Sequence, residues 1–191
     1  MNELARRLLP TTLAVAAAAF TTGCAGDAPL GPDLPALQAQ AGPRTADLGA
    51  CDSLAAPAGS RLQFHAHASG VQIYRWTGTT WSFVGPSAVL SADAGGRSMV
   101  GTHYAGPTGP VWESNAGGKV VGAVLKRCPS DAGAIPWLLL AATPDGGPGI
   151  FQRVAFIQRI NTAGGNAPAE AGTAVGEEAR VRYSTEYLFY R

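Results

Sequence analysis

In the segment Arg61-Leu62-Gln63-Phe64-His65-Ala66-His67, apolar and polar side chains alternate strictly. Successive residues of an extended strand point to opposite faces, so the even-numbered apolar residues share one face and the odd-numbered polar residues share the other. This period of two is typical of a strand that is buried on one side only. The segment therefore predicts a sheet with one face packed against a core.

Similar apolar segments follow along the chain, and each is bounded by a turn rich in glycine. The first turn is expected at Ser69-Gly70, because serine and glycine favour turn conformations. The segment 135–142 is apolar throughout, so it is either a central strand or a short core helix. The expected further strands are 71–76, 81–84, 98–104, 119–126, 135–142, 150–161 and 181–190.

The composition also favours short strands over long surface helices. The chain of 191 residues contains 25 glycines and 14 prolines, and only 14% of its residues are charged. About eight short strands without a strong amphipathic helix between them predict one all-β domain over residues 51–191, either a β-sandwich or a distorted antiparallel barrel. The formal net charge of +1 leaves no basic footprint for nucleic acid.

The N-terminal residues 1–23 read as a signal peptide of the lipoprotein type. Arg6 and Arg7 precede an apolar run over 8–20 that is shorter than a membrane span. The run ends in Thr21-Thr22-Gly23-Cys24, which resembles the bacterial lipobox and makes Cys24 the expected site of lipidation. The alternative is ordinary cleavage near Ala25. We expect an exported protein of the cell envelope, anchored by lipid in the outer membrane if the source is Gram-negative.

Residues 24–50 are rich in alanine, proline and glycine and show no sustained period. Such a composition predicts a flexible tether between anchor and domain. A short helix around 34–40 is the alternative.

The chain has two cysteines besides Cys24, and we expect these two, Cys51 and Cys128, to form a disulfide in an exported protein. Two buried free thiols are the alternative.

Five ordered blocks of the chain form one pattern: 70–74, 101–107 with 112–113, 135–140, 157–159 with 162–168, and 183–190. Together they resemble the domain of unknown function 3455 family, which comprises secreted proteins of bacteria and fungi, from about Pro57 to Arg191. The resemblance implies an exported location and a single domain, and it implies no settled activity. Some members carry the label malate dehydrogenase, but this chain lacks a G-x-G-x-x-G motif after a strand, so we reject that activity for it.

The histidines are the groups that titrate near neutral pH. His65 and His67 share a strand face, and a three-histidine metal site with His103 would need their strands to be neighbours. A solvated polar face is the favoured interpretation, so we predict no metal.

For an enzyme, the best acid–base pair is His103 with Glu113, on an expected long loop. Gln158 and Arg159 are expected to face solvent or to satisfy backbone groups.

Four aromatic residues offer an alternative, a platform for sugar rings or a partner protein. They are Trp76, Trp81, Tyr104 and Trp112, and burial in the core competes with this use. We expect a monomeric, non-catalytic envelope protein without cofactor that binds an envelope or carbohydrate ligand through the block from His103 to Glu113. The alternative is a small periplasmic or cell-surface enzyme in which His103 and Glu113 converge in a cleft.

Overall fold

The structure is a computed structural model that describes residues 46–129 and 131–191. The predicted signal peptide, the lipidation site Cys24, the tether up to residue 45 and the alternative helix at 34–40 lie outside the described residues. Across the part that is described, no helix has the length and the apolar character needed to cross a membrane.

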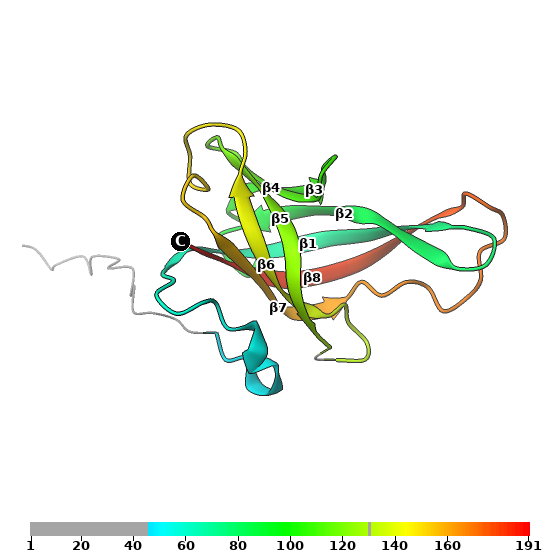
Figure 1. Cartoon of the computed structure of the whole chain (residues 1–191). Coiled ribbons are helices and arrows are strands. Elements are labelled where there is room, and N and C mark those ends of the chain that lie inside the picture. Colours follow the sequence, from blue (N-terminus) through cyan, green and yellow to red (C-terminus); the bar gives the residue numbers. More distant parts are fainter. Residues whose placement is uncertain (1–45, 130) are drawn as a thin grey trace, which may run out of the picture. The chain divides into compact units, whose positions relative to one another are not determined.

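Eight antiparallel strands form a closed barrel (Figure 1). Each strand pairs with the next along the chain, and the first strand pairs with the last, so the sheet has no free edge. This confirms the all-β prediction and decides between its two forms in favour of the barrel. The strands are β1 Leu62–Trp76, β2 Trp81–Ser91, β3 Met99–Ala105, β4 Pro110–Ser114, β5 Lys119–Cys128, β6 Trp137–Pro144, β7 Phe156–Gly164 and β8 Glu178–Tyr190.

The predicted alternation in β1 is wrong at Leu62, which packs with Leu188 and Tyr190 in an outer cluster because the β1–β8 pairing is irregular between Leu62 and Phe64. From Phe64 to Tyr74 the even-numbered side chains lie inside the barrel. Ala66 and Ala68 are buried there with Trp112 of β4 and with Tyr187 and Phe189 of β8. The small residues of β1 leave room for these large rings, which contact one another edge to face. The aromatic residues therefore form much of the barrel's core.

One end of the barrel is filled by the connection between β6 and β7. Phe151 and Val154 of this connection are each 1% exposed. The Phe151 ring lies 5.1 Å from that of Phe189 and 6.1 Å from that of Phe64, measured between centroids. This end of the interior is therefore packed with side chains.

The short 3-10 helix η1, Gly49–Leu54, covers the outer face of the barrel rather than its interior. Leu54 is fully buried there, and its carbonyl accepts a hydrogen bond of 2.7 Å from Gln158 Nε2. A disulfide joins Cys51 to Cys128 at the end of β5, which confirms the predicted pair. Ala46 and Leu48 also pack on this face, so the last five residues of the predicted tether belong to the folded domain.

The expected turn at Ser69-Gly70 is wrong, because β1 continues through it to Trp76. Gly70 is required there for another reason. A Cβ atom on this residue would lie 2.2 Å from the carbonyl oxygen of Ser87 in β2, so only glycine permits the close approach of the two strands.

Two further expectations are corrected. The block from His103 to Glu113 is a β-hairpin rather than a long loop, with β3 and β4 joined by a tight turn. The strand expected over 150–161 begins at Phe156, because residues 150–153 form a turn and Phe151 fills the barrel end. The apolar segment from residue 135 is a strand and not a helix, although β6 begins at Trp137.

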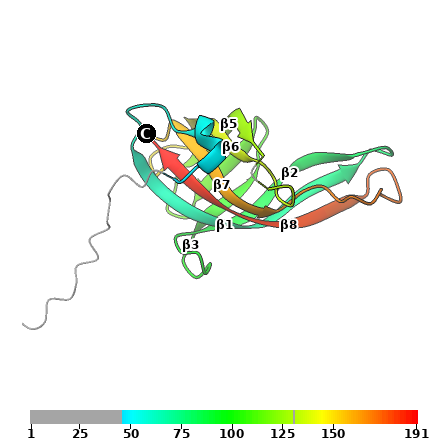
Figure 2. The same cartoon turned by 90° about the horizontal axis from the view of Figure 1, so that it is seen from below.

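The strands β1, β2 and β8 run on past the others as a three-stranded extension (Figure 2). Trp76 and Trp81 face each other at the tip of its first hairpin, with ring centroids 5.3 Å apart. The connection between β7 and β8 packs beside them, since Trp81 Nε1 donates a hydrogen bond of 2.8 Å to the Glu170 carbonyl. These tryptophans therefore lie outside the barrel core.

Candidate functional site

A cavity of about 570 Å³ lies inside the barrel at the end opposite Phe151. Its walls come from all eight strands and from the β3–β4 and β5–β6 connections. It reaches solvent, because the exposed side chains of Phe83 and Arg127 are part of its lining. Its volume is in the range of small-molecule sites, roughly 300 to 1,000 Å³. The apolar and aromatic walls include Tyr74, Phe83, Trp112, Leu138, Leu140 and Tyr187.

The charged residues that line the cavity are two arginines. No aspartate or glutamate is among the described lining residues. Arg159 of β7 points inward, and its Nε and Nη2 atoms donate hydrogen bonds of 3.2 and 2.7 Å to the Pro136 carbonyl. In the part of the chain that the structure describes, no carboxylate forms an ion pair with this guanidinium. The cavity is therefore electropositive.

Several buried polar groups around the cavity have no hydrogen-bond partner among the described residues. They include the donors Gln72 Nε2 and Trp112 Nε1, and the hydroxyl of Tyr187. Burial raises the pKa of the Tyr187 hydroxyl, and the nearby Arg159 and Tyr183 also influence this pKa. Neither of these two contacts has hydrogen-bond geometry. Unpaired buried donors are costly, and these groups belong to residues that line the cavity.

His103 is buried in the wall of this cavity with 3% of its surface exposed. Its ring stacks on Trp112 with centroids 4.3 Å apart, and its Nδ1 atom lies 2.8 Å from the Val111 carbonyl. Because a carbonyl only accepts, Nδ1 carries the proton. Burial lowers the pKa of His103 to about 3, and the nearby Arg159 charge acts in the same direction, so the ring is neutral at physiological pH.

Glu113 lies on the opposite side of the barrel wall from His103. The register pairs His103 with Trp112 and Thr102 with Glu113, which places the carboxylate on the outer face. There the Tyr104 hydroxyl donates a hydrogen bond of 2.6 Å to Glu113 Oε2, and this bond raises the pKa of Tyr104. The structure therefore does not bring the expected acid–base pair together.

The four aromatic candidates are likewise separated. Trp112 is inside the barrel, Tyr104 is on its outer face, and Trp76 and Trp81 are at the tip of the extension. Only Trp112 lines the cavity among these four. A single platform built from all four is not formed.

The histidines also divide between the two faces. His65 and His67 lie on the outer face of β1, next to Glu186 of β8, whereas His103 is inside. The strand with His103 pairs with β2 and β4 and not with β1. The three-histidine arrangement is thus absent from the described structure.

Gln72 and Arg159 were not predicted from the sequence as cavity residues. Arg159 does satisfy a backbone group, as expected, but it also faces the barrel interior. The available signal was the period of two in β7, where Arg159 shares a face with Ile157, a fully buried residue. A charged residue on the apolar face of a strand is the kind of exception that indicates a site.

A family model described as "Protein of unknown function (DUF3455)" matches residues 57–191, which include all eight strands. No curated protein matches the chain. No solved structure matches it either.

Proposed function

The chain belongs to the DUF3455 family, whose description assigns no activity, and we propose that it is an exported binding protein whose barrel cavity holds a small organic anion. The observation that carries this proposal is the inward-facing Arg159, which has no carboxylate partner among the described residues. The cavity is a binding site in this proposal and not a site of catalysis.

The walls define the body of the ligand. Trp112, Leu138 and Leu140 present apolar surface to the cavity, and the ring of Phe83 stands at its exposed edge. Small-molecule sites combine such surface with a few polar groups that fix orientation. A flat or ring-containing molecule of moderate size fits this lining better than a strongly hydrated sugar does.

The polar groups define the charged end of the ligand. Arg159, Gln72 Nε2 and Trp112 Nε1 are all donors, and none of them can accept a hydrogen bond. The neutral His103 adds no second cation to this group. A carboxylate or sulfonate would accept from several donors at once and would balance the Arg159 charge.

Replacing Arg159 with methionine is expected to weaken binding of anilinonaphthalene sulfonate by at least about tenfold. The reason is the loss of a charge-assisted hydrogen bond, which contributes about 1.5 to 3 kcal/mol in a protein interior. Binding is measured by titrating the dye and following its fluorescence. Phenylnaphthylamine, which has the same rings without the sulfonate, should bind wild type and variant alike.

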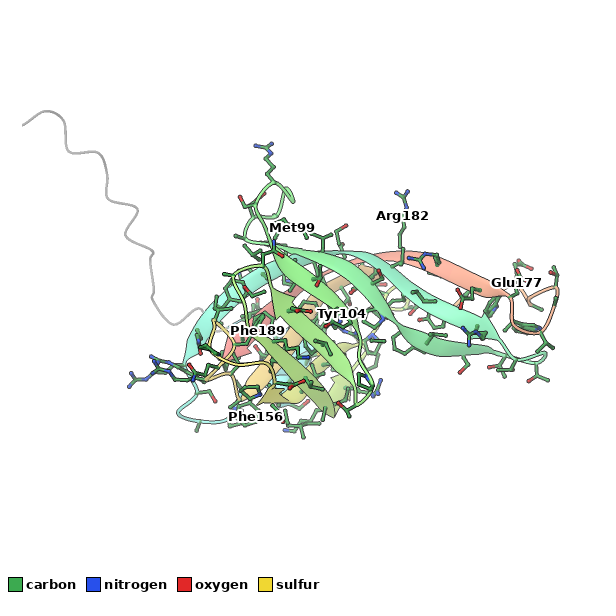
Figure 3. The ribbon with its side chains drawn as sticks, turned by 90° about the horizontal axis from the view of Figure 1, so that it is seen from above. Met99, Tyr104, Phe156, Glu177, Arg182 and Phe189 are labelled. Carbon is green, nitrogen blue, oxygen red and sulfur yellow. A yellow bond between two sulfur atoms is a disulfide. The ribbon has the colours of Figure 1, made fainter. Side chains whose placement is uncertain are left out.

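The matched control is Arg182→Met on β8. Arg182 is exposed and points away from the barrel in Figure 3. This variant should bind the anionic dye with wild-type affinity. Equal affinity of the Arg159 variant and the wild type, with both proteins folded by circular dichroism, would contradict the proposal.

Export and lipid anchoring through Cys24 complete the proposed function. They rest on the sequence of the leader, which lies outside the described residues. In protein purified from membranes of its native host, we expect an intact mass that starts at Cys24 and includes diacylglyceryl or triacyl groups. The Cys24→Ala variant should lack this added mass. A freely secreted chain without lipid would refute the anchor but leave the barrel proposal standing.

A further inference from the structure

A second site lies on the outside of the barrel, across the seam where the first and last strands meet. His65 and His67 project from the outer face of β1, and Glu186 projects from β8, where it faces His67 directly in the strand register. The His65 Nε2 atom lies 2.9 Å from Glu186 Oε2, and the two imidazole rings are 4.7 Å apart between centroids. One ligand atom from each residue falls within 4.8 Å of the other two.

We propose that His65, His67 and Glu186 bind one divalent transition-metal ion of the zinc class. Two imidazole nitrogens and one carboxylate oxygen form a donor set that zinc prefers, whereas magnesium and calcium prefer oxygen donors alone. Zinc–nitrogen bonds of about 2.0 to 2.1 Å place tetrahedral ligands roughly 3.3 Å apart. The three groups need only small rotamer adjustments to reach that spacing, because the strands already hold them on one face.

A second shell supports the carboxylate. Asn161 of β7 donates a hydrogen bond of 3.0 Å from Nδ2 to Glu186 Oε1, which leaves Oε2 directed at His65. Asn161 is the described non-glycine residue with a positive φ, 51°, and it lies in an irregularity of the β7–β8 pairing. Backbone strain of this kind persists where the surrounding structure holds it, and functional sites are enriched in it. Outer-shell hydrogen bonds of this kind orient metal ligands.

The three ligands leave at least one coordination position for water or for another molecule. His65, Asn161 and Glu186 line a groove of about 760 Å³ between the barrel wall and the N-terminal segment 46–51. The side chains of His65 and Glu186 are 30% and 28% exposed. The metal is thus accessible from solvent, and its open position would face this groove. The proposed metal site is separate from the barrel cavity and does not depend on it.

The test is calorimetric titration of ZnCl₂ into chelator-treated protein purified without a histidine tag. The wild type is expected to bind one zinc ion per chain, and His67→Ala is expected to lose at least about 100-fold in affinity, because a first-shell ligand contributes more than the 10- to 100-fold of an outer-shell partner. Cobalt(II) should show the intense visible absorption of a four-coordinate nitrogen and oxygen site in the wild type and lose it in the variant.

Three variants separate metal binding from an ordinary histidine–carboxylate contact. Glu186→Gln should abolish tight zinc binding, and the same change at Glu113, an exposed carboxylate bonded to Tyr104, should leave it unchanged. Asn161→Gly accepts the positive φ and removes only the amide, so it should lower zinc affinity about tenfold with the fold intact. Absence of zinc binding by the folded wild type, or equal binding by Glu186→Gln, would overturn the proposal.

Discussion

Replacing Cys51 and Cys128 together with alanine is expected to lower the free energy of unfolding by about 4 to 5 kcal/mol. The bond closes a loop with a sequence separation of 77, and removing it restores the conformational entropy of that loop in the unfolded chain. The bond also holds η1 against the barrel, where Cys51 and Leu54 are buried with Leu139. The measurement is urea unfolding at equilibrium, followed by circular dichroism.

The wild type in a reducing agent is the control for this variant. It should lose stability by a similar amount, whereas the double variant should not respond to the reductant. A difference below about 1 kcal/mol between the oxidised wild type and the double variant would show that the bridge contributes little, because an intact 77-residue loop should not be neutral.

The second large effect is a loss of stability in acid that is caused by His103. Its pKa is about 3 in the folded protein, because the ring is buried, and about 6.5 in an unfolded chain. Below about pH 6.5 the unfolded state therefore takes up a proton that the folded state excludes, and stability falls by about 1.4 kcal/mol for each pH unit down to about pH 3. At pH 4.5 the expected loss relative to pH 7 is about 2 to 3 kcal/mol.

The variant His103→Gln isolates this contribution. Glutamine keeps a donor for the Val111 carbonyl but does not titrate. The free energy of unfolding of the variant should therefore fall less between pH 7 and pH 4.5 than that of the wild type. The ring of Tyr187 faces His103, and its hydroxyl keeps its proton in this interval because burial raises its pKa. Parallel stability curves for the two proteins, from urea unfolding at each pH, would contradict the burial of a neutral ring.

Local alternation was sufficient to predict the β class and which face of β1 is buried. It was also sufficient to place the turns rich in glycine between most strands. It could not decide between sandwich and barrel, because that depends on whether the last strand meets the first. The pairing of Leu62 with Tyr190 and of Arg75 with Glu178 is a long-range property with no local signal.

Gly70 shows why a turn was predicted inside a strand. Serine followed by glycine has the same local preference in a turn as at a point where two strands approach closely. The close approach of the strands depends on Ser87 of β2, because its carbonyl oxygen lies where a Cβ atom of residue 70 would clash with it. The sequence near Gly70 contains nothing that distinguishes the two.

The candidate site was predicted in part. His103 and Trp112 do line the cavity, but their block also contains Glu113, which the strand period sends to the outer face. Once the block is read as a hairpin instead of a loop, the period of two separates His103 from Glu113. The grouping of Gln72 with Arg159 requires β1 and β7 to lie on the two sides of β8, and this follows from closure alone.

The seam between β1 and β8 has a consequence for the order of folding. His65 and Glu186 are separated by 121 residues, so β1 is synthesised long before the strand that completes its hydrogen bonds. Until β8 arrives, one side of β1 is an open edge that other chains can pair with. Such a high contact order makes closure slow, and the chain is most vulnerable to misassembly in this interval. The barrel can therefore close only after the C-terminal strand β8 has paired with β1.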